Sequence, residues 1–187
     1  TNVLPLVSKR IINNTCKILN FNYTDTLERA YKVPAENILY IHGKALSSKK
    51  LVVGHHDIST FQYGAVSPFN AAEEHGIYIQ DDDEDFRITE TKEIIKAYFQ
   101  KTYKDTFGII QMNQNFFDSL ININEIFILG HSLSSVDMDY FVEIRKRVLH
   151  SCKWYISYFS ESDLDNMEYF AKRLDIKNFQ PVMLSNL

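Results

Sequence analysis

The sequence has little of what marks several protein classes. It has 2 cysteines, and neither has a Cys or His partner at metal-ligand spacing, so we expect buried thiols in a cytoplasmic protein. No apolar run approaches the ~20 residues that a membrane span needs, and no signal peptide is visible. The 6 glycines are scattered, with no G-x-G spacing, so no glycine-rich phosphate loop is present. Because neither a membrane span nor a signal peptide is visible, we expect no contact with a membrane.

The sequence also lacks a basic excess. Its formal net charge is −4, whereas nucleic-acid binding normally shows a basic footprint. The acidic run Gln80–Arg87 is typical of a solvated loop rather than a metal site. The adjacent His55 and His56, which precede Asp57, face opposite ways on an extended segment. We therefore predict no metal site and disfavour a nucleic-acid partner.

The chain has 187 residues, of which 45% are hydrophobic, and this length and composition are typical of a soluble globular protein. We predict one α/β domain. The helical spacings at 136–149 and 161–174 alternate with short apolar runs, which predicts a mostly parallel sheet flanked by helices. Between these parts, residues 88–120 read as two helices that break near Gly108, the first capped by Thr89 or Thr91. The strand runs are "CKILNF", "NILYIHG", "KLVVGH", "EIFILGHS", "KWYISYF" and "QPVMLS".

The first polar strand end follows "ILNF". In parallel α/β sheets, ligands bind beyond the carboxyl ends of the strands, on the loops that lead into helices. Asp25 or Thr24 can cap the next helix, and Glu28 has the spacing of a capping box. These capping roles do not involve Asn20, Asn22 and Tyr23. Two interpretations are open for these three residues, a structural capping role and contact with a ligand.

The second polar end is "YIHGK". His42 follows an apolar run, and Gly43 permits a tight turn. A histidine exchanges a proton near neutral pH, so His42 can act as a base. The competing interpretation is a hydrogen-bonded structural histidine.

The third polar end is "GHSLSSVD", which offers Gly130, His131, Ser132 and Asp137 before a helix capped near Ser135. Gly130 lets the backbone approach a ligand closely, and Ser132 can bind ribose or phosphate oxygens. A G-x-S-x-G elbow is absent, which disfavours serine-hydrolase chemistry.

Together, "NFNYTDTLERAY", "ILYIHGK", "LVVGHH" and "IFILGHSLSSVDMDYF" resemble the bacteriophage abortive infection family AbiH. The resemblance runs from Ile18 to about Tyr158. It implies a bacterial or prophage-encoded antiviral defence protein that blocks phage propagation at the expense of the infected cell.

A more distant similarity is to sirtuin-like domains, which bind and cleave NAD on a Rossmann-like sheet. It implies that Asn22 lies near the nicotinamide ribose, that His42 is the base, and that Gly130 and Ser132 hold the adenosine side. The Asp expected two residues after Asn22 is Thr24 here, and Asp25 follows one residue later. Thr24, Asn20, Tyr23, Gly43, His131 and Asp137 complete the predicted set around the nucleotide.

Both families begin with a glycine-containing strand and turn that cradles phosphate or adenosine, and this sequence shows none. Because it opens on Thr1 rather than Met, we expect the carboxyl-terminal part of a longer AbiH-like protein that lacks the first strand of the sheet.

The leading hypothesis is a defence effector that binds a nucleotide, either NAD or another one, and cleaves its N-glycosidic bond. Catalysis would use His42, Asn22 and Asp25. A second hypothesis is a module that senses a nucleotide or a phage product and signals through a partner. A third is a nuclease. A phage-derived trigger and a homo-oligomer are the partners left open.

Overall fold

The computed structural model describes residues 11–13, 15–47, 51–54, 94, 97 and 103–184. The chain divides into two compact units, Thr1–Val52 with Thr106–Leu187, and Val53–Asp105. The predicted features at His55 to Asp57, Gln80–Arg87, Thr89 and Thr91 lie outside the described residues. The helices and strands described below all belong to the first unit.

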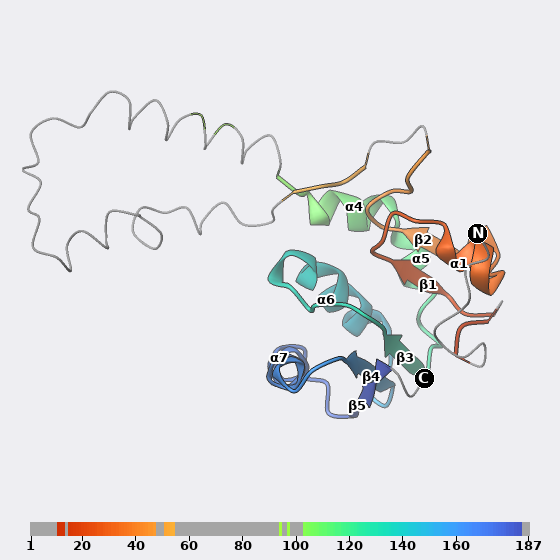
Figure 1. Cartoon of the computed structure of the whole chain (residues 1–187). Helices are drawn as coiled ribbons and strands as arrows, with labels where there is room; N and C mark the ends of the chain where they lie inside the picture. Colours follow the sequence, from red (N-terminus) through yellow and green to blue (C-terminus); the bar gives the residue numbers. More distant parts are fainter. Residues whose placement is uncertain are drawn as a thin grey trace, which may run out of the picture. The chain divides into compact units, whose positions relative to one another are not determined.

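Strands and helices alternate along this unit, as the apolar runs predict (Figure 1). In chain order they are β1 (Ile18–Asn20), α1 (Thr26–Tyr31), the 3-10 turn η1 (Ala35–Asn37), β2 (Ile38–Tyr40), α4 (Thr106–Met112), α5 (Gln114–Asp118), β3 (Glu125–Ile128), the 3-10 turn η3 (Ser135–Asp137), α6 (Met138–Arg147), β4 (Lys153–Tyr158), α7 (Ser162–Arg173) and β5 (Phe179–Met183).

All strand pairs among the described residues are parallel, which confirms the predicted α/β class. The prediction of one sheet is wrong, because β1 pairs with β2 alone and β3, β4 and β5 form a separate sheet in that order. A cavity lies between β1 and β3 and separates the two sheets. The predicted strand "KLVVGH" is also wrong in its described part, where Val52 N–H donates to His42 O at 2.9 Å but no strand forms.

The two helices after β3 match their predicted ranges closely. In α6, Met138, Phe141 and Ile144 face the core, while Leu149 lies past the end of the helix and is 55% exposed. A helix boundary lies near Gly108 as predicted, because the described residues 103–105 are non-helical and α4 begins just after them, with Gly108 in its first turn. A further break, at Asn113, separates α4 from α5. No helix in the described ranges is long and apolar enough to cross a membrane.

The core is aromatic, as the composition suggests. Four aromatic side chains are fully buried in one hydrophobic core: Trp154 of β4, Tyr140 of α6, Phe170 of α7 and Phe117 of α5. Cys152 is buried among them, but the prediction of two buried thiols is wrong for Cys16, which is half-buried. Its sulfur donates to Ile11 O at 3.1 Å.

Strand β5 carries Pro181 opposite Ile156 of β4. Trp154 N–H donates to Asn178 O, so in this parallel pair Asn178 and every second residue after it face β4. Pro181 therefore faces away from β4, where its missing N–H removes no bond of the ladder.

Candidate ligand site at the strand ends

The loop after β1 is shaped by an asparagine rather than by a capping box. Asn20 is 8% exposed, and its Oδ1 accepts the N–H of Asn22 at 2.9 Å, which turns the chain. The predicted capping box is wrong, because Asp25 occupies the cap position of α1 without a side-chain bond to the helix. Asp25 Oδ1 lies instead 3.7 Å from Arg29 Nη1, and both side chains are exposed.

Glu28, the other half of the predicted box, reaches across to the loop after β2. It forms an ion pair with Lys44, and Tyr40 Oη donates to its Oε2 at 3.2 Å. Burial, and then the negative charge of Glu28, raise the pKa of Tyr40 to about 12. This network ties the exit of β2 to α1.

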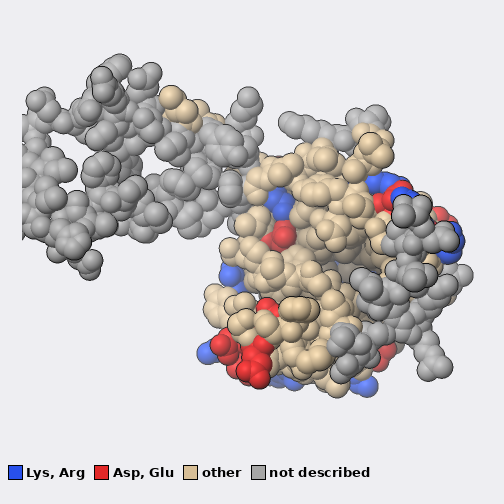
Figure 2. Space-filling model, viewed as in Figure 1, with Lys and Arg blue, Asp and Glu red and all other residues tan. Residues whose placement is uncertain are grey.

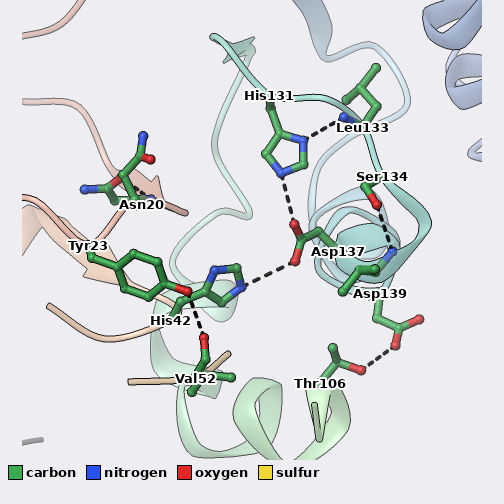
Figure 3. Close-up of polar contacts among 12 residues, drawn as sticks. Asn20, Tyr23, His42, Val52, Thr106, His131, Leu133, Ser134, Asp137 and Asp139 are labelled. Carbon is green, nitrogen blue, oxygen red and sulfur yellow. Dashed lines mark hydrogen bonds and ion pairs between the residues drawn. The ribbon is translucent and has the colours of Figure 1, made fainter. Parts of the chain in front are cut away.

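Asp137, at the end of η3, lies between two imidazole rings that come from different strand ends (Figure 3). Its Oδ1 is 3.3 Å from His42 Nε2, and its Oδ2 is 3.4 Å from His131 Nε2. His42 Nε2 is buried and makes no hydrogen bond of good geometry, so its approach to Asp137 is close but poorly aligned. One carboxylate thus links the second and third polar ends.

The tautomer of His131 follows from its neighbours. The N–H of Leu133 donates to His131 Nδ1 at 2.9 Å, so that nitrogen is an acceptor and the ring proton lies on Nε2, toward Asp137. Leu133 has φ +55°, a left-handed conformation that is unusual for a bulky side chain. The backbone is therefore locally strained at Leu133, the residue whose N–H orients the His131 ring.

Phe21 is a residue that the sequence argument missed. Its ring centroid is 4.4 Å from that of His131 and 5.6 Å from that of His42, and it stacks on Phe141. Phe21 is part of the "NFNYTD" motif, but its apolar side chain looked like an ordinary end of a strand. It is the side chain that packs between the two histidines.

A cavity of about 890 Å³ lies between β1 and β3 and contains six of the predicted residues at its polar end. These are Asn20, Asn22, Thr24, Gly130, His131 and Ser132. The rest of its lining is largely apolar and includes Phe21, Phe127 and Phe141. The first and third strand ends therefore meet at one cavity, whereas the second, which carries His42, does not line it.

Gly130 is fixed by a serine that the sequence argument also missed. Its N–H donates to Ser157 Oγ at 2.8 Å, and Ser157, on β4, is 7% exposed. A polar residue in the middle of the apolar run "KWYISYF" was the available signal. Gly130 has φ +62°, and a Cβ placed there would meet no atom within 4 Å, so backbone conformation alone calls for glycine.

The other predicted residues lie outside this lining. His42 and Asp137 are packed behind Phe21, and Tyr23 Oη donates to Val52 O at 3.0 Å. Gly43 has φ +88° and makes the tight turn after β2. Within the described ranges, no three His, Cys, Asp or Glu side chains are grouped to hold a metal ion.

The charges near the site are few. Among the described lining residues, Lys17 and Glu125 are the charged ones, and neither belongs to the polar end. Figure 2 shows one face of the molecule, on which acidic side chains gather over α7 and no continuous basic surface is visible. The polar end thus offers neutral amide, hydroxyl and backbone groups, which suit sugar hydroxyls and the edges of bases.

Comparison with known proteins gives one match. Residues 2–158 match the family described as bacteriophage abortive infection AbiH. No curated protein and no solved structure matches the chain.

Proposed function

Since the chain belongs to the bacteriophage abortive infection AbiH family, we propose that it serves phage defence by binding a nucleotide, NAD foremost, at the polar end of the cavity between β1 and β3. The observation that carries the proposal is that two strand ends far apart in sequence contribute to this one cavity. A volume near 890 Å³ lies within the usual range for small-molecule sites. The strand-end motifs resemble those of sirtuin-like domains, which makes NAD the first ligand to test.

Asn22, Thr24 and Ser132 supply the hydrogen-bonding groups for the ligand, and Gly130 leaves space for its approach. Aromatic side chains along the same wall favour a planar ring. In the catalytic version of the proposal, Asn22 orients the N-glycosidic bond and His42 acts as the general base. A general base must come within hydrogen-bond reach of the proton that it removes.

The position of His42 favours a second candidate, a nucleotide sensor without turnover. His42 is 6% exposed and lies behind Phe21. Cleavage therefore requires Phe21 to move when the ligand binds, whereas binding alone requires no such movement.

Binding is tested by thermal unfolding of the purified chain with NAD. A ligand at 100 times its dissociation constant stabilises by about 2.7 kcal/mol. Ser132→Ala should reduce this gain, and Ser151→Ala, at an exposed position beyond α6, is the matched control. Equal stabilisation of all three proteins would remove the proposed site.

Turnover is tested separately by following nicotinamide release from NAD, with His42→Ala beside the wild type. Release by the wild type and not by the variant supports cleavage. Stabilisation by NAD without release supports the sensor. A protein that NAD neither stabilises nor reacts with would refute both versions for this nucleotide.

A further inference from the structure

A groove lies on the side of α6 that faces away from the candidate ligand site. It runs between α4 and α6 and has a volume of about 580 Å³. Ile144 and Val148 of α6 line the cavity between β1 and β3. Asp139 and Glu143 lie on the other side of the same helix and line the groove. Among the described residues the two hollows share none of their lining, so what the groove binds is independent of the nucleotide.

The walls of the groove are held together at both ends of α6. At its start, Thr106 Oγ1 of α4 donates to Asp139 Oδ2 (Figure 3). At its end, Arg147 forms an ion pair with Asp118 of α5. Helices α4 and α5 therefore follow α6 in the same direction, and the start of α4 marks the same end of the groove as the start of α6.

An aromatic side chain is exposed on the rim at that end. Phe107 of α4 is 72% exposed, although Ile110, one turn further along the helix, is buried in the groove. Val142 lines the α6 side and is half-buried. An exposed aromatic ring beside an apolar floor favours burial of the ring against another molecule.

The charged side chains of the groove are ordered along α6. Asp139 and Glu143 come first, and Lys146 and Arg147 follow. The helix dipole favours this order within one chain, but it does not account for the exposed ring of Phe107. Lys146 Nζ lies 3.4 Å from Glu143 Oε2, and its side chain is 65% exposed, so the ammonium group is accessible to a second carboxylate.

A second copy of the chain complements this order. When two identical α6 helices lie antiparallel across a two-fold axis, the acidic start of each helix faces the basic end of the other. A parallel arrangement would bring like charges together. The same two-fold axis directs Phe107 toward the basic end of the other groove, where the alkyl stems and cations of Lys146 and Arg147 suit an aromatic ring.

We propose that the α4–α6 groove is the contact surface of a homodimer, in which two copies of the chain pair antiparallel along α6. Phe107 is the apolar anchor, and the charges of α6 determine the orientation. Because the surface centres on one groove, the dimer dissociates on dilution. This surface accounts for the homo-oligomer that the sequence leaves open.

The experiment measures the mass of the full chain, without nucleotide, by sedimentation equilibrium from micromolar to near-millimolar protein. Lys146→Glu and Glu143→Lys each reverse one charge of the groove, and they are studied separately and as an equal mixture. The matched control is Lys172→Glu, which changes an exposed lysine in the last turn of α7, as Lys146 lies in the last turn of α6. Fluorescence of the buried Trp154 verifies that each variant is folded.

We expect the wild type and Lys172→Glu to dimerise with the same Kd. Each groove variant alone should raise the Kd by about tenfold or more. The equal mixture should recover the dimer, because the excess acidic charge of one variant then faces the excess basic charge of the other. Damage to the fold of either variant would not be repaired by mixing.

The aromatic anchor is tested in the same way. Phe107→Ser should also raise the Kd by about tenfold. Phe159→Ser removes a ring that is 89% exposed just after β4, outside the groove, and should leave the Kd unchanged.

Four results would overturn the proposal. A dimer that is insensitive to the groove variants uses another surface, and single variants that do not recover on mixing exclude antiparallel pairing. A wild type that is monomeric at every concentration, with Phe107→Ser less stable in urea, means that a segment of the same chain covers the ring. A monomer whose stability is unchanged by Phe107→Ser leaves the groove to a partner of another kind.

Discussion

Replacing Asp137 by alanine tests whether the carboxylate holds the two strand ends together. Asp137 is the N-cap residue of α6 and makes no side-chain cap bond to it, so the variant loses no such bond. The loss comes from His131 Nε2–H, which is left without its acceptor at 3.4 Å, and from the weaker approach to His42 at 3.3 Å. An unsatisfied buried polar group costs about 1–3 kcal/mol.

Both distances are at the long end for a hydrogen bond, so we place the total near 2 kcal/mol, in the lower half of what two such losses could give. For a chain of this size, that corresponds to about 4–8 °C in Tm. Asp137→Asn keeps one acceptor oxygen for His131 and should lose about half as much.

The assay is urea unfolding followed by tryptophan fluorescence, because the sequence has 1 tryptophan and Trp154 is 2% exposed. Asp165→Ala, at an exposed position in the first turn of α7, controls for the loss of a carboxylate and should cost below about 1 kcal/mol. An Asp137→Ala protein within about 0.5 kcal/mol of the wild type would show that the contacts with the histidines carry no stability.

Three further predictions concern backbone conformation and pH. Gly130→Ala should destabilise by about 1–2 kcal/mol through its φ of +62°, and Gly130→Asn by less, since asparagine tolerates that conformation; equal losses in urea unfolding would contradict this. Burial, then Glu28, raise the pKa of Tyr40 to about 12, so stability should fall as pH rises from about 10 through 12, and Tyr40→Phe should flatten that part of the stability curve. The Ser160 N–H lowers the pKa of Asp163, so its contribution is present above about pH 4 and is lost as the pH falls below it; an Asp163→Asn protein equally sensitive to acid would refute this.

The sequence predicts well those features that depend on local pattern. Helices α6 and α7 follow from apolar spacing, and the parallel pairing follows from strands that alternate with helices. The meeting of Asn22 and Ser132 at one cavity follows from the rule that ligands bind at the carboxyl ends of parallel strands.

Features that depend on tertiary contacts were beyond the sequence. Glu28 has the spacing of a capping box but pairs with Lys44, because a long-range ion pair competes with the local bond. Phe21 is apolar and is therefore no candidate from the sequence, yet its ring lines the cavity and packs against His42, which does not line it. Gly108 lies inside α4 despite the low helix propensity of glycine.

Pro181 affects how the outer edge of β5 can associate with another molecule. Its ring replaces the N–H donor that a strand of a neighbouring molecule would need there, so edge-to-edge pairing of separate molecules is obstructed along β5. Among the described strands, β5 thus ends its sheet on a side where a second molecule cannot continue the ladder with unbroken hydrogen bonds.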